Sequence, residues 1–361
     1  MRLTLIQNEA KKHEKSGEMA VGKISEVNQK NVNWLWKERL AYGKITIYAG
    51  EPGVGKSQLL LYMASIVSLG GRFHGENRLC NKDKVLLICN EDNADDTIKP
   101  RLMALGADLE NIDYVKGIQT FDAGGNEYFS PISIVENIVE LENQIKANAY
   151  KLIIIDPISL YLGSIDDGKN KEIRHVLAIL NALAERHHAC IVLNSHFTKP
   201  SNNASKSSAI YRVMGSIGFI AGSRMAFAVL KDDEDPEKRV VSSIKNNLVK
   251  ESKGLIYTIE SFLVDKIETS RIKWSNETSN KTADDLLNSQ RDKSSPKLDD
   301  AKTLLLEMLR NGSVPVSEIR KAFEADGLSV NRMYAAKNAL KIYENDSFVG
   351  RRGKIWSLPA E

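Results

Sequence analysis

The chain has 361 residues, and its 50 lysines and arginines nearly balance its 47 aspartates and glutamates, giving a formal net charge of +3. This length allows two or three domains. The charge excludes a histone-like or polycationic protein, although it leaves room for a local basic groove that binds nucleic acid.

The sequence argues against a membrane or an oxidising compartment. No segment approaches the roughly 18 consecutive apolar residues of a membrane span, and the N-terminus turns polar and charged at once, unlike a signal peptide. The three cysteines, Cys80, Cys89 and Cys190, form neither a CxxC pair nor a metal-ligand spacing. We therefore expect a cytoplasmic protein with neither a disulfide scaffold nor a zinc site.

Residues 1–30 are polar and predict an N-terminal arm, whereas residues 31–264 alternate between apolar strands and helical patterns. The strands rich in Ile, Leu and Val are expected at 44–49, 84–90, 151–156 and 190–194. The helices among them are expected at 58–69, 95–105, 132–147 and 170–187. This alternation predicts an α/β core with a mostly parallel central sheet that is buried on both faces.

Three shorter strands with a more alternating pattern follow, and they are expected to add an antiparallel edge: 224–230, 239–245 and 255–261. Residues 265–297 are rich in Ser, Asn, Thr, Asp and Lys, with little apolar periodicity. Such a composition buries too little surface to offset chain entropy, and it predicts a flexible linker. Helical periodicity resumes in residues 298–361, which we call the C-terminal module.

The segment from Gly50 to Ser57 reads GEPGVGKS and matches the phosphate-binding pattern G-x-x-x-x-G-K-[ST]. A strand is expected before it and an apolar helix after it, which disfavours a chance glycine-rich turn. Glycines let backbone N–H groups converge on phosphate oxygens, and the helix N-terminus adds positive potential. We expect Lys56 to reach the β- and γ-phosphates of ATP and Ser57 to ligate Mg²⁺. The expected ATP-binding residues are Gly50, Glu51, Pro52, Gly53, Val54, Gly55, Lys56, Ser57 and Gln58.

Polar residues end three of the other predicted strands. Asp156 is expected to hold Mg²⁺ at the carboxyl edge of the sheet, with strand capping as the alternative. Glu91 is expected to orient the attacking water, and Asp92 is its rival. Either acid could instead stabilise a helix N-terminus, which is the favoured interpretation for Asp92. His196 is either a sensor of the γ-phosphate or a structural histidine.

Further short motifs accompany these residues: Trp34-Leu35-Trp36, Gly43-Lys44, Arg101-Leu102 and Leu105-Gly106. Together they resemble the RecA-like ATPases related to the plasmid replicative helicase RepA, over roughly residues 33–261. Many mobile-element and prophage ATPases share this pattern. The resemblance implies Lys56 and Ser57 on ATP and Mg²⁺, Glu91 as the catalytic base, Asp156 as the metal-side acid and His196 as the sensor.

The resemblance also implies a ring, most simply a hexamer, whose subunits complete one another's sites. Arg224, which follows Ala-Gly-Ser, resembles an arginine finger directed at the ATP of the neighbouring subunit. Lys245, in the sequence SIKNN, resembles a second residue that reaches across. The alternative for both is an ordinary charge at a strand edge.

The long polar segment at residues 197–216 is the expected site for single-stranded DNA, because the corresponding loop of related rings faces the central channel. Its cations would track the phosphate backbone: Lys199, Lys206 and Arg212. Tyr211 either stacks on a base or anchors the loop, and residues 159–171 are a weaker second candidate.

The C-terminal module is expected to contain helices at 299–310, 315–325 and 331–340 and a hairpin at 348–356. This arrangement resembles a winged helix, whose third helix and wing would contact DNA. The cations in question are Arg332, Lys337, Lys341, Arg351, Arg352 and Lys354. The alternative is a module that docks a replication or host protein.

The sequence therefore predicts an ATP-hydrolysing ring ATPase that acts on DNA. The favoured function is that of a helicase or single-stranded DNA translocase in the replication of a mobile element, plasmid or phage. The alternative is an ATP-dependent DNA-binding regulator or switch, in replication, recombination or defence, that does not unwind.

Overall fold

The structure is a computed structural model that describes residues 19–122, 124–163, 165, 170–198, 208–213, 217–250, 252–293, 296–346 and 354–359. The chain divides into two units, Met1–Asn33 and Trp34–Glu361. The described part of the first unit contains the short 3₁₀ helix Ile24–Glu26. Residues 1–18 of the predicted N-terminal arm lie outside the described residues.

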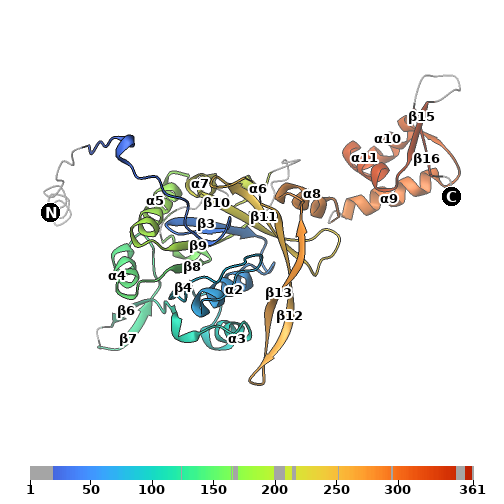
Figure 1. Cartoon of the computed structure of the whole chain (residues 1–361). Helices are drawn as coiled ribbons and strands as arrows, with labels where there is room; N and C mark the ends of the chain where they lie inside the picture. Colours follow the sequence, from blue (N-terminus) through green and yellow to red (C-terminus); the bar gives the residue numbers. More distant parts are fainter. Residues whose placement is uncertain are drawn as a thin grey trace, which may run out of the picture. The chain divides into compact units, whose positions relative to one another are not determined.

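A nine-stranded sheet forms the centre of the second unit among the described residues (Figure 1). Its parallel strands are β3 (Lys44–Gly50), β4 (Val85–Cys89), β5 (Ile112–Tyr114), β8 (Leu152–Asp156), β9 (Cys190–His196) and β10 (Met225–Lys231). Three antiparallel strands extend it from β10: β11 (Arg239–Asn246), β12 (Gly254–Val264) and β13 (Ile267–Ser279). The order across the sheet is β13-β12-β11-β10-β3-β9-β8-β4-β5. The sequence prediction of a mostly parallel sheet with an antiparallel edge is confirmed.

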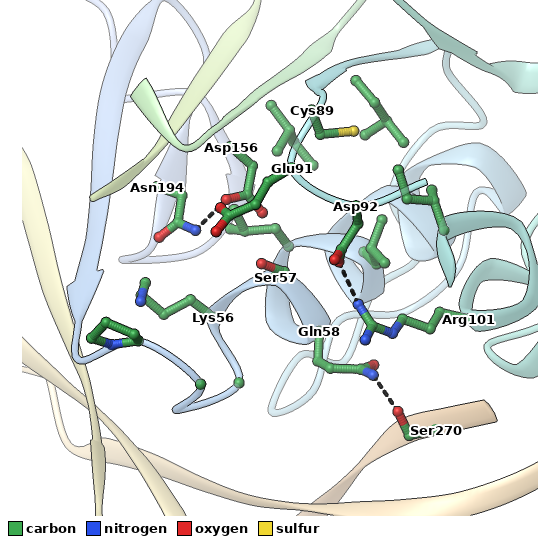
Figure 2. Close-up of a pocket in the computed structure, with 18 of the residues that line it drawn as sticks. Lys56, Ser57, Gln58, Cys89, Glu91, Asp92, Arg101, Asp156, Asn194 and Ser270 are labelled. Atoms are coloured by element: carbon green, nitrogen blue, oxygen red, sulfur yellow. Dashed lines mark hydrogen bonds and ion pairs between the residues drawn. The ribbon is translucent and has the colours of Figure 1, made fainter. Parts of the chain in front are cut away.

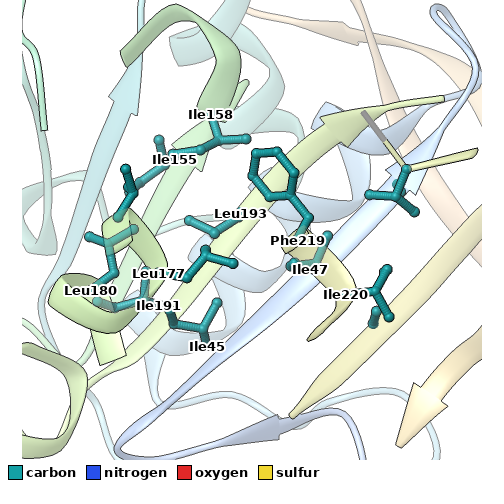
Figure 3. Close-up of a cluster of buried hydrophobic side chains, with 14 of the residues drawn as sticks. Ile45, Ile47, Ile155, Ile158, Leu177, Leu180, Ile191, Leu193, Phe219 and Ile220 are labelled. Carbon is teal, nitrogen blue, oxygen red and sulfur yellow. The ribbon is translucent and has the colours of Figure 1, made fainter. Parts of the chain in front are cut away.

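Helices bury both faces of this sheet. One face packs against α2 (Lys56–Leu69) and α3 (Lys99–Ala104). The other face packs against α4 (Ile138–Asn148), α5 (Asn170–His187), α7 (Ile217–Gly222) and α8 (Ala283–Lys293). Figure 3 shows this second layer, where side chains from alternate positions of the strands meet those of α5 and α7. Period-two alternation places Ile45 and Ile47 in this layer and Tyr48 in the other.

Smaller elements connect the layers. They are the strands β1 (Trp34–Trp36), β2 (Leu40–Ala41), β6 (Ile118–Phe121) and β7 (Glu127–Ser130), the short helix α6 (Ala209–Arg212), the π-helix Ala94–Ile98, and the 3₁₀ helices Leu109–Asn111 and Ile158–Tyr161. The predicted helix at 95–105 is thus a π-helix followed by α3.

The structure differs from the sequence prediction at residues 265–297, where we expected a flexible linker. Strand β13 pairs with β12 along its length, and α8 packs on the face of the sheet that carries α5. The composition misleads because few side chains of this segment are buried. Ile272 of β13 is buried in the layer of α2, and Leu286 and Leu287 of α8 are buried in the layer of α5. Backbone hydrogen bonds hold the rest of β13.

The C-terminal module forms helices α9 (Pro296–Leu309), α10 (Val316–Ala325) and α11 (Val330–Ala339) and a small sheet of order β14-β16-β15. The strands of that sheet are β14 (Val314–Pro315), β15 (Tyr343–Asp346) and β16 (Lys354–Ser357). A core around Leu305, Phe323 and Trp356 holds the three helices and the sheet together. The expected hairpin at 348–356 begins earlier, with β15, and its turn lies outside the described residues. Across the described part of the chain, no helix combines the length and apolar character that a membrane span requires.

Candidate nucleotide-binding site

The phosphate-binding loop joins the end of β3 to the start of α2. Gly53 and Gly55 have φ angles of +70° and +102°, in the left-handed region that favours glycine. Gly50 is needed for a different reason, because a Cβ atom there would lie 2.4 Å from the carbonyl oxygen of Val229. The loop opens at the N-terminus of α2, where backbone N–H groups without an intrahelical partner favour an anion.

Lys56 is buried and turns back onto this loop. Its Nζ donates hydrogen bonds to the carbonyl oxygens of Gly50 (3.0 Å) and Glu51 (2.8 Å) and lies 3.3 Å from Nδ1 of His196. Burial lowers the pKa of the Lys56 ammonium to about 8, while nearby carboxylates, Asp156 first, raise it. Burial and the charge of Lys56 lower the pKa of His196. The histidine is therefore held neutral beside the lysine that would meet the phosphates.

Asp156 ends β8 and is also buried. Its carboxylate accepts a hydrogen bond from Nδ2 of Asn194 on the neighbouring strand β9. Burial raises the pKa of Asp156, whereas hydrogen bonding to Asn194 and Ser57 and the charge of Lys56 lower it. Asp156 and Ser57 thus present adjacent oxygen ligands, which are the kind that Mg²⁺ prefers. The donor set fits the metal predicted from the sequence.

Glu91 and Asp92 follow β4, at the same edge of the sheet, and the structure separates their surroundings. Asp92 accepts a hydrogen bond from Nη1 of Arg101 on α3 (2.7 Å). Glu91 lies on the side of the cavity that holds Asp156 and Ser57 (Figure 2). Its charge acts on both Lys56 and Asp156. Glu91 is therefore the acid that faces the candidate reaction centre.

A cavity of about 330 Å³ unites residues that the sequence predicts from separate motifs. Its lining includes Pro52, Gly53, Gly55, Lys56, Ser57, Gln58, Glu91, Asp92, Arg101, Asp156, Asn194 and His196. Gly50, Glu51 and Val54 are not among the lining residues, although the first two accept the hydrogen bonds of Lys56. The convergence follows from topology, since the carboxyl ends of β3, β4, β8 and β9 lie at one edge of a parallel sheet.

The antiparallel strands contribute residues that sequence reasoning missed. Ile259 of β12 and Ser270 of β13 line the cavity, and the hydroxyl of Ser270 accepts a hydrogen bond from Nε2 of Gln58 (2.6 Å). Tyr257 of β12 is fully buried, and its hydroxyl donates to the carbonyl oxygen of Gly55 (3.0 Å). The alternating pattern near 255–261 indicated a strand, but no local signal showed that it reaches the phosphate-binding loop.

The two residues expected to act across a subunit boundary lie away from this cavity. Arg224 precedes β10, at the amino edge of the parallel strands, and lines a separate cavity of about 310 Å³ with Lys44, Asn181 and Glu185. Lys245 of β11 donates to the carbonyl oxygens of Ile220 and Ser223, both at 2.7 Å. Its ammonium therefore binds the turn that leads into Arg224, which differs from the expected reach toward a neighbour.

The structure corrects the expected DNA contact at Arg212. This arginine is only 4% exposed, its Nη2 lies 2.6 Å from Oε1 of Glu51, and its guanidinium lies over the ring of Phe197 at 5.0 Å. A buried, paired guanidinium cannot track a phosphate backbone. Tyr211 beside it is 62% exposed. Lys199 and Lys206 lie outside the described residues, as does most of 164–169 in the second candidate segment.

The C-terminal module also differs from expectation at Lys337. Its Nζ lies 2.7 Å from the Glu344 carboxylate and 4.9 Å from the centre of the Trp356 ring. Lys354 and Nε1 of Trp356 donate to the same carboxylate, so hydrogen bonds, that of Lys337 first, lower the pKa of Glu344 to about 2. Arg332 is half-buried and Lys341 is exposed. Arg351 and Arg352 lie outside the described residues.

Curated proteins that are similar to the chain are named DNA repair proteins. The DNA repair protein RadA of Synechocystis sp. is 24% identical over 236 residues, which are 64% of this chain and 42% of that protein. The DNA repair protein RadA of Mycobacterium tuberculosis is 27% identical over 161 residues, which are 44% of this chain and 28% of that protein. The chain thus spans less than half the length of these relatives.

A sequence model of the AAA domain family matches residues 13–202. This range contains the phosphate-binding loop and all the residues from β3 to β9 that meet at the cavity. Together with the RadA relatives it supports the broader of the two sequence predictions, a RecA-like ATPase, while the RepA-like branch stays a prediction. Because the match covers more than half of the chain, the protein belongs to the AAA domain family and is a P-loop ATPase of RecA-like fold.

Proposed function

We propose that the protein hydrolyses ATP and couples hydrolysis to work on DNA. The observation that carries the proposal is the single cavity in which Lys56, Ser57, Glu91, Asp156 and His196 meet. A phosphate-binding loop, a pair of oxygens suited to a metal ion, and an acid that forms no ion pair with any described residue are the parts that phosphoryl transfer to water requires. The names of the RadA relatives support DNA as the partner.

Each residue of the cavity has a distinct role in this proposal. Lys56 would exchange its hydrogen bonds with Gly50 and Glu51 for phosphate oxygens. Ser57 and Asp156 would hold Mg²⁺, which supplies charge neutralisation on the phosphates when it is bound. Glu91 would accept a proton from the attacking water, and His196 would sense the γ-phosphate through a hydrogen bond.

We propose further that the active form is a ring, with six subunits as in the RepA-like helicases that the sequence resembles. Arg224 does not line the nucleotide cavity of its own chain and lies at the opposite edge of the parallel strands. That position suits an arginine finger supplied to a neighbour, which contributes about 10³–10⁵ in rate where it occurs. Within such a ring, the activity proposed is that of a helicase or translocase on single-stranded DNA, in plasmid, phage or mobile-element replication.

The C-terminal module is proposed to be a winged helix that binds DNA or docks a replication or host partner. Three helices followed by a small antiparallel sheet support this proposal. The engagement of Lys337 and Lys354 by Glu344 leaves Arg332 and Lys341 as the candidate contacts within the described residues of α11 and the turn that follows it.

Steady-state ATP hydrolysis with and without single-stranded DNA, measured together with oligomer mass, tests the proposal. Hydrolysis should rise on adding DNA and vanish in Lys56→Ala, whereas Lys146→Ala on the exposed face of α4 should match the wild type. Hydrolysis that ignores DNA would contradict the motor function. Strand displacement on a forked duplex then distinguishes a helicase from a DNA-bound switch, which would hydrolyse ATP without separating strands.

A further inference from the structure

One residue of the phosphate-binding loop, Glu51, carries a negative charge, the same sign as the charge of the proposed phosphate ligand. Glu51 is the second residue of the loop, and its backbone carbonyl accepts a hydrogen bond from Lys56. The charge of its carboxylate acts on Lys56, whose pKa it raises, and the same negative charge would repel a triphosphate bound to this loop. The side chain of Glu51 is 53% exposed. A cation beside Glu51 would offset this repulsion.

Arg212 supplies that cation from 161 positions further along the chain. Its Nη2 lies 2.6 Å from Oε1 of Glu51, while its own side chain is only 5% exposed. A buried guanidinium without a partner would destabilise the fold, so burial of Arg212 favours its ion pair with Glu51. Within the described residues, Glu51 is the carboxylate that pairs with it.

The guanidinium is held in place from several directions. It lies over the ring of Phe197, and the backbone carbonyl of Arg212 accepts a hydrogen bond from the amide of Thr198 (2.7 Å). Phe197 in turn donates its amide to the carbonyl oxygen of Gly50 (3.1 Å). The end of β9 and α6 thus form one hydrogen-bonded unit with the phosphate-binding loop.

Helix α8 anchors the other end of α6. The Asp284 carboxylate accepts hydrogen bonds from the hydroxyl of Ser208 (2.8 and 3.0 Å) and from the amide of Ala209 (2.6 Å). Ala209 and Val213 are buried, which fixes the short helix against the core. These contacts hold α6 in the position from which Arg212 reaches Glu51.

We infer that Arg212 is a positioning residue for nucleotide binding, which neutralises Glu51 so that the phosphate-binding loop can accept a polyanion. The inference rests on the proposed function, since it concerns the same site. It assigns to Arg212 a role inside the ATPase core in place of the DNA contact expected from the sequence. Charge neutralisation, unlike a packing role, makes the effect of losing Arg212 depend on Glu51 and on salt.

The test compares Arg212→Met, Glu51→Gln and the double variant by ATPase kinetics and by titration with a fluorescent ATP analogue. Arg212→Met should raise the KM and the dissociation constant about tenfold at about 50 mM KCl, with kcat nearly unchanged. The rise should shrink at about 300 mM KCl. Glu51→Gln should restore affinity to Arg212→Met, because the repelling charge is then absent. Arg186→Met, whose arginine pairs with Glu142 away from the loop, is the matched control.

Each outcome bears on the inference. An unchanged KM in Arg212→Met, a rise that high salt does not reduce, or a double variant without recovered affinity would each overturn it. Glu51→Gln by itself leaves the buried Arg212 guanidinium without its carboxylate, whereas the double variant contains no buried unpaired charge and remains informative if Glu51→Gln unfolds. A wild-type chain that binds the analogue without hydrolysing ATP would defeat the proposed function, yet the three affinities would still decide the role of Arg212.

Discussion

The hydroxyl of Tyr257 donates a hydrogen bond to the carbonyl oxygen of Gly55, at 3.0 Å, from the antiparallel part of the sheet to the phosphate-binding loop. A Cβ atom at Gly55 would lie 2.7 Å from Ile259, two positions further along the same strand. The loop is therefore supported from outside the parallel strands that carry the other site residues. This contact makes β12 part of the nucleotide site.

Tyr257→Phe should weaken that support while preserving the packing of the ring. The substitution leaves the Gly55 carbonyl without its partner, so we expect a loss of about 1 kcal/mol in the free energy of unfolding and a higher KM for ATP. Denaturant unfolding and steady-state kinetics measure the two effects. Tyr128→Phe, at an exposed tyrosine of β7, is the control. An equal loss in that variant would show that the effect does not come from the hydrogen bond between Tyr257 and Gly55.

Cysteine labelling tests the placement of the cavity. Burial raises the pKa of the Cys89 thiol to about 12 and that of Cys80 to about 11. Both thiols should therefore alkylate slowly near pH 8, Cys89 more slowly, with rates that rise about tenfold per pH unit because the thiolate is the reactive form. Since Cys89 lines the cavity and Cys80 does not, ATP should protect only Cys89. Mass spectrometry of the labelled peptides measures the protection of each cysteine. Equal protection of Cys80 and Cys89 would contradict this placement.

Glu91→Gln should separate binding from chemistry. The variant keeps its size and hydrogen-bonding capacity but cannot accept the proton of the attacking water, so kcat should fall by about 10²–10⁴ while nucleotide affinity is retained. Asp92→Asn is the matched comparison, because Asp92 is paired with Arg101. Its expected effect is a modest change in stability with kcat largely preserved. Loss of kcat in Asp92→Asn alone would reverse the assignment of the two acids.

Mixing two inactive variants tests the proposed ring. Arg224→Ala should bind ATP and hydrolyse it about 10³-fold more slowly, because the cation offered to the neighbouring site is missing. In mixed rings with Glu91→Gln, some interfaces combine an intact Glu91 with an intact Arg224, and part of the activity should return. Activity that stays absent at every mixing ratio would argue for a role of Arg224 within its own subunit.

Two cations of α11 should behave differently. Arg332→Ala should weaken DNA binding and reduce the magnitude of its salt dependence by about one released ion, as expected for a phosphate contact. Lys337→Ala should instead destabilise the C-terminal module, because its ammonium is paired with Glu344 and lies over Trp356. Binding isotherms over a range of salt and thermal unfolding measure these effects. Unchanged DNA affinity in both variants would favour protein docking.

Local sequence pattern predicted the strands and most of the phosphate-binding site. The segment from Gly50 to Ser57 specifies its own turn through glycines, and short apolar runs ending in Asp156 or preceding Glu91 indicate strands of a parallel sheet. Because parallel strands share one carboxyl edge, the order of these motifs already implied that their side chains meet. The arrangement in the cavity agrees with that expectation.

The sequence pattern did not predict contacts between residues that lie far apart in the chain. The composition of residues 265–297 concealed β13 and α8, because backbone pairing and a few buried side chains hold them. Arg212 and Lys337 looked like free cations for DNA, yet each is bound to a carboxylate, Glu51 and Glu344 respectively. A charged side chain has no periodicity that reveals its partner.

The sequence by itself thus determined the α/β core, the phosphate-binding loop and the acids at the sheet edge, since these follow from glycine geometry and apolar periodicity within short segments. Only the tertiary structure decided that Tyr257 supports Gly55, that Arg212 pairs with Glu51 and that Lys245 binds the turn before Arg224. The physical reason is that a buried polar group must find a partner, and packing of distant segments determines which partner is within reach.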